Sequence, residues 1–422
     1  MRTKGFTLRA AEKPVMKASK KQKGEKKGKD FKISLRGRHP EGLRTWIEID
    51  TAAMKHNMEI FSGLLQDAER ENMSGKKTLL MSVVKSNAYG HDLVSFSKKM
   101  EQLGADFLGV DSITEAVRLR KEKIKIPILV LGYTLPENFA LAEKNRIDLT
   151  LSSFDQLSLF AKYTGKKPIR VHVKIDTGMH RQGFFPEDAE KLPAMFKKTP
   201  QIKIAGMYTH FANGKNPSFP HDSKQQMERF ERAVRALETA GFSGFLKHAG
   251  ATSGTILYPE YHFDMVRVGI GMYGLWPSEE TRRAYEEKFQ LMPVLSWKTV
   301  VSEIKMLPKG ESIGYDFTET FRQQTTIAIL PLGYWHGFVR AFSSVGNVLV
   351  KGQRARVLGR VSMDMVAVDI TDIPGVAPHE VVTLLGKDGT EEITAEELGK
   401  FSGTTNYEVV TRLNPKMKRI HF

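Results

Sequence analysis

The side chain whose position first suggests chemistry is Lys85, which ends the apolar run Leu79–Lys85 and opens the segment KSNAYGH. A lysine at the end of a buried strand is costly to hold as an ammonium ion, and the neutral amine is a good nucleophile. This is the setting in which lysines form Schiff bases with carbonyl compounds. A strand-end lysine can also simply extend its ammonium group into water, and the residues around Lys85 leave both interpretations open.

Other apolar runs also end in residues that carry charge or hydrogen-bonding groups. These residues lie in four segments at the ends of the runs: KIDTGMHRQGF, YTHFA, HAGATSG and RVGIGMYG. Cationic and imidazole side chains at several strand ends are suited to acid–base chemistry or to an anionic ligand. The histidines among them are also compatible with ordinary core positions. The residues are Lys174, Arg181, His210, His248 and Arg267.

Hydroxyl and glycine residues gather after the last two of these runs. Thr252 and Ser253 stand among small residues, which let backbone N–H groups approach a ligand as a phosphate site requires. The segment Gly269–Gly274 also matches the G-x-G-x-x-G pattern of dinucleotide-binding folds. No convincing helix or ribose-binding acid follows it, so we favour the phosphate interpretation.

These residues come together if the runs before them are parallel strands of one barrel. Eight short runs alternate with candidate helices within residues 45–290, which predicts an α/β fold with a closed (β/α)8 barrel. Catalytic groups stand at the carboxyl ends of the strands in such barrels. One connecting helix is expected at Lys224–Ala240, capped by Asp222 or Ser223 and ended by Gly241. The eight runs are Leu79–Lys85, Phe107–Asp111, Ile128–Gly132, Asp148–Leu151, Ile169–Asp176, Ile204–His210, Phe245–Ala249 and Met265–Ile270.

After Met292 and Pro293 the helical pattern nearly disappears, and residues 291–422 are predicted to form an all-β domain. One helix is expected there, at Thr394–Phe401. The strand-like segment Thr45–Asp50 precedes the first barrel helix and is a candidate to join the sheet of the β domain. The expected strands are Val294–Leu307, Thr326–Leu332, Asn347–Lys351, Ala355–Val361, Met365–Thr371 and Val381–Leu385.

Composition excludes several classes of protein. The chain has 422 residues and no cysteine, so disulfides, thiol nucleophiles and cysteine zinc sites are ruled out, and no metal site is expected. No apolar stretch is long enough to cross a membrane and no signal peptide is evident, which predicts a cytoplasmic protein. Of the formal net charge of +16, +11 lies in residues 1–44, which we expect to be a disordered basic tail. Such a tail is able to contact nucleic acid, but nothing in it reads bases.

Six segments, in this order and spacing, resemble the alanine racemase family, whose members are pyridoxal-phosphate (PLP) enzymes with a barrel followed by a β domain. The resemblance runs from about Thr45 to Phe422. It implies interconversion of L- and D-alanine, supply of D-alanine for peptidoglycan, and a homodimer with shared active sites. The segments are VVKSNAYGH, KIDTGMHRQGF, RVGIGMYG, IGYDFTETF, ILPLGYWHG and GRVSMDM.

The resemblance also assigns roles to individual residues. Lys85 is implied to bind PLP as a Schiff base and to exchange the substrate Cα proton on one face, and Tyr315 to do so on the other face from the partner subunit. Arg267 is implied to face the pyridine nitrogen, with His248 behind it and His210 against the ring. The other implied contacts are Tyr89, Thr252, Tyr334 and the backbone of Gly269 and Ile270 for the phosphate, Arg181 and the backbone near Met363 for the substrate carboxylate, and Lys174, a lysine that is carbamylated in some members.

The chemistry of racemisation explains why these residue types are needed. Negative charge develops at Cα when its proton leaves, and the PLP ring disperses that charge. One acid–base group is needed on each face, because a single base returns the proton to the side from which it came. An arginine at the ring nitrogen disfavours protonation of the ring, which fits simple proton exchange better than transamination.

The chain departs from the family pattern at three positions. His336 replaces an acid in GYWHG, Met365 replaces a glutamine after GRVSMD, and Pro415 stands where some members carry a tyrosine that narrows the pocket. Removing one wall of a methyl-sized pocket admits larger amino acids. A racemase of broader specificity and a non-catalytic PLP-binding protein therefore stay open as alternatives. A decarboxylase is disfavoured, because it ordinarily uses a cysteine and an acid at the ring nitrogen.

Overall fold

A computed structural model describes residues 40, 42–71 and 77–422 of the chain. The basic segment predicted at residues 1–44 therefore lies almost entirely outside the described residues. Within them, no helix is long and apolar enough to cross a membrane.

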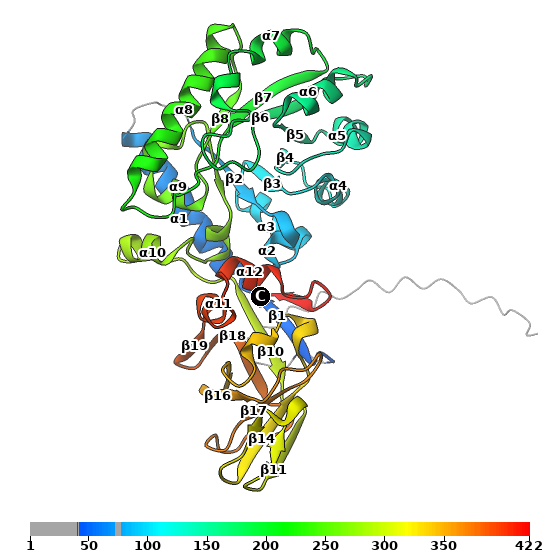
Figure 1. The fold of residues 1–422 in the computed structure, drawn as a ribbon, viewed down its shortest axis with the longest axis vertical. Coiled ribbons are helices and arrows are strands. Elements are labelled where there is room, and N and C mark those ends of the chain that lie inside the picture. Colours follow the sequence, from blue (N-terminus) through cyan, green and yellow to red (C-terminus); the bar gives the residue numbers. More distant parts are fainter. Residues whose placement is uncertain (1–39, 41, 72–76) are drawn as a thin grey trace, which may run out of the picture. The chain divides into compact units, whose positions relative to one another are not determined.

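An eight-stranded parallel sheet forms the first half of the described chain, as the alternating pattern predicts (Figure 1). Its strands follow in the order β8-β7-β6-β5-β4-β3-β2-β9. The two end strands then approach each other: the Arg267 N–H donates to the Gly250 carbonyl at 2.9 Å and the Asp264 N–H to the Lys247 carbonyl at 3.0 Å. The sheet thus curls into a near-closed barrel, which confirms the predicted fold class. The strands are β2 (Leu79–Val83), β3 (Phe107–Val110), β4 (Ile128–Val130), β5 (Asp148–Leu151), β6 (Ile169–Lys174), β7 (Ile202–Tyr208), β8 (Leu246–His248) and β9 (Met265–Val268).

Helices alternate with these strands, and α8 (Pro220–Thr239) shows how the sequence sets their positions. Its buried face includes Met227, Phe230 and Leu237, at the spacing that predicts an amphipathic helix. The predicted start is wrong, because Pro220 occupies the first turn and Phe219, rather than Asp222 or Ser223, is the N-cap. The other helices are α1 (Thr51–Glu71), α3 (Leu93–Gln102), α4 (Ile113–Lys121), α5 (Phe139–Asn145), α6 (Phe154–Ala161), α7 (Leu192–Lys197), α9 (Thr252–Leu257) and α10 (Glu279–Tyr285).

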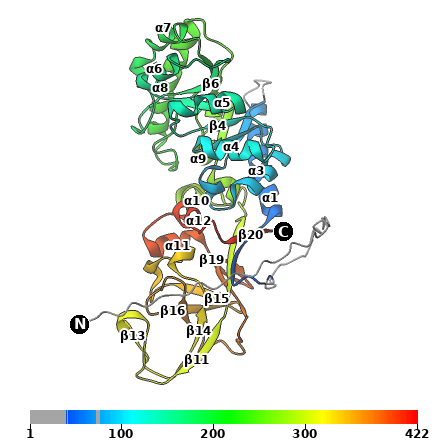
Figure 2. The ribbon, with the colours of Figure 1, turned by 90° about the vertical axis from the view of Figure 1, so that its right-hand side faces the viewer.

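The later part of the chain is rich in β-strands. A ten-stranded sheet has the order β11-β14-β17-β16-β15-β18-β10-β1-β20, with β19 beside β18. As predicted, β1 (Thr45–Ile49) belongs to this sheet: it pairs antiparallel with β10 (Leu295–Val300) and parallel with β20 (Lys418–His421) (Figure 2). The remaining strands are β11 (Glu303–Leu307), β14 (Thr325–Leu330), β15 (Asn347–Val350), β16 (Gln353–Leu358), β17 (Val366–Asp369), β18 (Val381–Asp388) and β19 (Glu391–Ile393), and β12 (Ser312–Ile313) pairs with β13 (Glu319–Thr320) in a separate hairpin.

Two expectations for this part of the chain are wrong. The predicted run Val294–Leu307 is two strands, because the chain turns at Val301 and Ser302 and the strands then pair with different partners, β18 and β14. The expected helix is present as α11 (Ala395–Ser402), capped by Thr394, but a second helix follows, α12 (Asn406–Thr411). Six residues carry too little periodicity for the sequence to show it.

Candidate functional site

The carboxyl ends of the barrel strands surround a cavity of about 840 Å³. Five cationic side chains line it against two carboxylates, those of Asp111 and Glu408, so the cavity favours an anionic ligand. Most of the predicted site residues are brought together there. They are Lys85, Tyr89, Lys174, Arg181, His210, Thr252, Arg267, Gly269 and Ile270.

The sequence predicts that Lys85 ends its strand. In the structure the strand β2 ends at Val83, and Lys85 follows two residues later. It begins the segment labelled α2 (Lys85–Tyr89), which is a left-handed turn: φ is 57° at Ser86, 57° at Asn87, 51° at Ala88 and 49° at Tyr89. This conformation costs L-residues roughly 1–2 kcal/mol each, so the surrounding structure must hold it in place. Strain at such a site is typical of a functional position.

Packing on both sides holds this turn. The Tyr89 ring stacks on Tyr273 with 4.8 Å between centroids, and burial raises the pKa of Tyr89 to about 12. The turn ends at Gly90, where φ is 83° and an added Cβ would lie 2.0 Å from the Val410 carbonyl oxygen of α12. Only glycine fits this close approach. The turn that carries Lys85 is therefore packed directly against the C-terminal segment.

Arg267 of β9 is buried without a carboxylate partner. Its Nη2 donates to the carbonyls of Thr209 and Ala249, both at 2.8 Å, and its Nη1 to the Nδ1 of His248 at 3.0 Å. Burial lowers its pKa to about 10, so the side chain is still charged near neutral pH. Among the described residues nothing accepts from its Nε, while the residue lines the cavity. This leaves the Nε–H of a fixed cation for a ligand atom, besides the second N–H of Nη1.

A line of buried polar groups runs from Arg267 into the barrel interior. Because Arg267 donates to His248 Nδ1, the His248 Nε2 carries the proton and faces His172 Nδ1 at 2.8 Å. His172 Nε2 in turn lies 3.3 Å from the Asp148 carboxylate. Burial opposes ionisation of Asp148, but hydrogen bonds from His172 and Arg170 keep its pKa lowered. All donors along the line point toward Asp148, so this carboxylate faces the charge of Arg267 through two imidazoles.

Two more predicted residues lie beside Arg267. His210 Nδ1 accepts from Arg267 Nη2 at 3.3 Å, and burial, together with the nearby arginines, lowers the pKa of His210 to about 3. Burial, then Arg181 and Arg267, lowers the pKa of Lys174 to about 8. Lys174 Nζ donates to Gln182 Oε1 at 3.3 Å. His210 is thus an uncharged ring at neutral pH, within a group of cations.

At the other end of the cavity, Thr252 organises a backbone turn. Its Oγ1 accepts from the Gly269 N–H at 3.1 Å and the Gly271 N–H at 3.3 Å. Ile270 begins the short 3-10 helix η4 (Ile270–Tyr273), where the first N–H has no partner within the helix. The Ile270 N–H therefore stays available to an anion, whereas the Gly269 N–H is already donated to Thr252.

Besides His248, which lies behind Arg267, three predicted site residues do not line this cavity. Tyr315, Tyr334 and Met363 lie on the β-rich domain, with 68%, 41% and 54% of their surface exposed. Tyr334 and Met363 stand together, because the Tyr334 and Trp335 N–H groups donate to the carbonyls of Ser362 and Met363 at 3.0 and 3.1 Å. Further large apolar side chains of this domain are exposed as well, namely Phe317, Trp335 and Met365.

The structure adds residues that sequence reasoning missed. Tyr407 of α12 lines the cavity, with its ring 6.2 Å from that of Tyr89 and the Lys215 ammonium 4.7 Å from its centroid. Tyr208 of β7 packs flat on His248 with 4.8 Å between centroids. Tyr407 lies in the segment NYEVV, but nothing in the sequence places this segment beside the barrel. Pro415, one of the three departures from the family pattern, is not among the residues that line the cavity.

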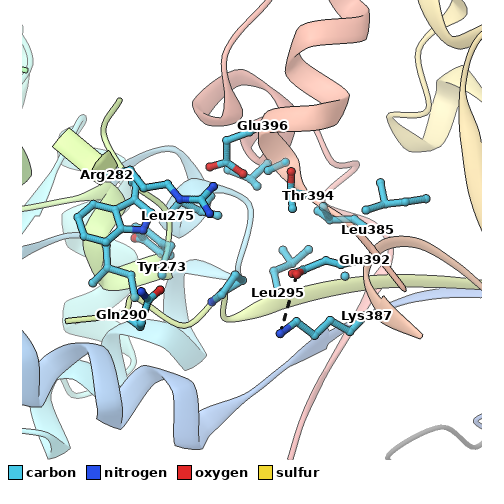
Figure 3. Close-up of a pocket in the computed structure, with 18 of the residues that line it drawn as sticks. Tyr273, Leu275, Arg282, Gln290, Leu295, Leu385, Lys387, Glu392, Thr394 and Glu396 are labelled. Atoms are coloured by element: carbon cyan, nitrogen blue, oxygen red, sulfur yellow. Dashed lines mark ion pairs between the residues drawn. The ribbon is translucent and has the colours of Figure 1, made fainter. Parts of the chain in front are cut away.

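A second cavity, of about 190 Å³, has Tyr273 in its lining (Figure 3). Side chains of the barrel, such as Arg282 and Gln290, and of the β-rich domain, such as Glu396, line it. Lys387 and Glu392 form an ion pair there at 3.8 Å. It contains none of the predicted site residues, so the larger cavity is the candidate active site.

Comparison with known proteins shows the family to which the chain belongs. The family model for the alanine racemase N-terminal domain matches residues 49–277, and the model for the alanine racemase C-terminal domain matches residues 294–421. The chain belongs to the alanine racemase family. The alanine racemase of Methanococcus maripaludis is 38% identical over 379 residues, which cover 89% of this chain and 98% of that protein. The alanine racemase of Leptospira interrogans is 36% identical over 383 residues, with 89% and 95% covered.

Solved alanine racemase structures have the same fold. The structure of the Bacillus anthracis alanine racemase with bound L-Ala-P matches with a TM-score of 0.83 and 31% identity, covering 91% of this chain and 96% of that one. An alanine racemase of Clostridium difficile 630 matches with a TM-score of 0.82 and 31% identity, covering 91% and 97%. Membership of the alanine racemase family identifies this chain as an amino-acid racemase, an isomerase.

Proposed function

We propose that this protein interconverts L- and D-alanine with pyridoxal phosphate as its cofactor. The observation that carries the proposal is the cavity in which Lys85, on its strained turn, faces Arg267 and a predominantly cationic lining. We further propose residues 45–290 as the barrel domain, apart from β1 (Thr45–Ile49), which pairs in the sheet of the β domain, and residues 291–422 as the β domain. We also propose D-alanine as a precursor of peptidoglycan.

The residues of the cavity fit the cofactor. Lys85 would bind it covalently, and the Ile270 N–H, Thr252 and Tyr89 would hold its phosphate at the far end. The unused Nε of Arg267 would face the ring nitrogen, with His248 behind it and His210 against the ring. When bound, PLP supplies an electron sink for the charge that develops at the substrate Cα. A guanidinium whose pKa stays near 10 does not give up its proton to a pyridine, so the ring stays a moderate sink.

The proposal needs one acid–base group on each face of Cα. Lys85 would move the proton on the face toward the barrel, and Arg181 would hold the substrate carboxylate, with Lys174 behind it. Of the β domain, Tyr407 and Glu408 line the cavity, but the Tyr407 ring packs beside Tyr89, at the end proposed for the phosphate, and Tyr315 does not line the cavity. We therefore propose a homodimer in which Tyr315, Tyr334 and the backbone near Met363 complete the partner subunit's site. The exposed apolar side chains around them are consistent with a face that a second copy covers.

A racemase of broader specificity is the second candidate. Its motivation is the absence of a tyrosine at Pro415, but that residue does not line the cavity and the Tyr407 ring does. We therefore favour alanine as the main substrate. A PLP-binding protein without catalysis has no use for a second acid–base group such as Tyr315.

A chiral assay tests the proposal. The full chain is incubated with PLP and L-alanine, L-serine or larger L-amino acids, and the D-enantiomer is measured. We expect alanine to be converted fastest and Lys85→Ala to lose both conversion and the visible absorbance of lysine-bound cofactor. Lys77→Ala is the matched control, because Lys77 is exposed and paired with Asp106 on the surface. Faster conversion of larger amino acids would support the broader racemase, and no conversion despite bound cofactor would overturn racemisation.

A further inference from the structure

The carbonyl that ends the Lys85 turn is held by a residue from the last described strand. Arg419 of β20 donates to the Gly90 carbonyl oxygen twice, from Nε at 3.1 Å and from Nη2 at 2.9 Å. Figures 1 and 2 show the red C-terminal segment, with α12 and β20, next to the barrel, and α12 contacts α2. The hydrogen bond from Arg419 to Gly90 joins two residues that are 329 positions apart in the sequence.

The other donors of Arg419 fix the segment that leads into β20. Its Nη1 donates to the Asn414 and Met417 carbonyls, both at 2.7 Å, and its Nη2 also reaches the Leu413 carbonyl at 3.3 Å. The guanidinium is buried, and all its hydrogen-bond partners among the described residues are carbonyl oxygens. Burial lowers its pKa to about 10, which shows that the charge is held at a cost. An apolar side chain would fill this volume without that cost, so packing alone does not explain an arginine here.

Within the described part of the chain, the Gly90 carbonyl is the one carbonyl of residues 86–90 that accepts a hydrogen bond from outside residues 86–92. The Ser86, Asn87 and Ala88 carbonyls accept from the N–H groups of Gly90, Asp92 and His91. The Tyr89 carbonyl accepts from the His91 ring at 3.0 Å. A left-handed turn of L-residues relaxes unless its ends are fixed. Arg419 is placed to fix the end opposite Lys85.

We propose that Arg419 is a positioning residue for Lys85: it ties the end of the left-handed turn to β20 and so keeps the lysine aimed into the cavity. The expected effect of Arg419 on cofactor binding rests on the proposed function. The expected effect of Arg419 on the turn is independent of that function. Arg419 touches neither substrate nor cofactor and acts through the backbone of residues 86–90.

The test compares Arg419→Met and Arg419→Lys with Lys418→Met. Lys418 is the matched control, because it is the neighbour of Arg419 in β20 but is exposed. Hydrogen–deuterium exchange of the peptide 85–93 is measured without cofactor, and the dissociation constant of PLP is measured by absorbance titration. We expect Arg419→Met to exchange at least tenfold faster in this peptide and to bind PLP at least tenfold more weakly. Arg419→Lys should be intermediate, since an ammonium restores one donor to the Gly90 carbonyl.

Unchanged exchange in peptide 85–93, in a folded Arg419→Lys or Arg419→Met, would overturn the proposal even if the melting temperature fell. The same holds if the exchange rises equally in peptides of the barrel far from the turn, because that pattern reports general destabilisation. Failure of the wild-type chain to bind PLP would instead contradict the proposed function and leave the exchange result valid. The Lys418→Met control should match the wild type in both measurements.

Discussion

Replacing His91 by glutamine should change how the stability of this protein depends on pH. The His91 ring is fully buried, and its Nδ1 donates to the Tyr89 carbonyl at 3.0 Å. Its Nε2 is buried and accepts no hydrogen bond from the described residues. Burial lowers the pKa of His91 to about 3, despite the opposing hydrogen bond to Tyr89. The folded protein therefore keeps this ring neutral over most of the acidic range.

The magnitude follows from proton linkage. The unfolded chain binds a proton at His91 with a pKa near 6.5, whereas the folded chain binds it only near pH 3. The protein has its full stability with respect to this group above pH 6.5. As the pH falls from there toward 3, the unfolding equilibrium constant rises about tenfold per pH unit, so the free energy of unfolding decreases. At pH 4.5 the loss is about 100-fold, or about 3 kcal/mol. Glutamine can donate to the same carbonyl and does not titrate.

The assay is urea unfolding of the wild type and His91→Gln at pH 7.5 and pH 4.5. Other titrating groups are common to both proteins and cancel in the difference between their free energies of unfolding. The wild-type advantage measured at pH 7.5 should shrink by about 3 kcal/mol at pH 4.5. His221→Gln, at an exposed position of α8, should show no such change. Parallel pH profiles for the wild type and His91→Gln would refute the reasoning.

Two further predictions concern the turn and the second base. Gly90→Ala should destabilise the protein by about 3 kcal/mol or more, because the new Cβ would lie 2.0 Å from the Val410 carbonyl oxygen. Ser86→Gly should stabilise the protein by about 1 kcal/mol, because glycine adopts the positive φ of this exposed residue without strain. Thermal unfolding of the two variants checks this contrast, and equal shifts of the same sign would contradict it. Tyr315→Phe should keep the cofactor but lower racemisation by about 100-fold or more, and in D₂O only one alanine enantiomer should still exchange its Cα hydrogen. Equal exchange from both enantiomers would count against a one-face role for Tyr315.

The sequence predicts the barrel and most of the cavity because the signals are local. Apolar runs end at or just before the cationic and hydroxyl residues, and parallel strands bring those ends to one face. Lys85, His210 and Arg267 could be proposed in this way. The membership of β1 in the second sheet followed from its position before the first helix.

Features that depend on distant contacts could not be predicted. The left-handed turn at Ser86–Tyr89 contradicts local preference and exists because Tyr273, α12 and Gly90 surround it. His172 and Asp148 lie within strands whose sequence looks like ordinary barrel interior, and their pairing depends on the register of neighbouring strands. Tyr407 comes from a six-residue helix far along the chain. In each case the determining contact lies across the fold rather than along the sequence.

The pairing of β1 with β20 sets an order of events for the newly made chain. All strands of the barrel have been synthesised by residue 268, yet β1 gains its parallel neighbour only with residues 418–421, and Thr51 Oγ1 donates to the Phe422 carbonyl across 371 residues. At about 5–20 residues per second, the ribosome needs roughly 8–30 s to pass from residue 268, the end of β9, to residue 418, the start of β20. During this time the Lys85 turn has neither α12 nor Arg419 beside it. The barrel strands are thus expected to be available for folding before the segment that fixes the Lys85 turn exists, so capture of the proposed cofactor would be a late step of biosynthesis.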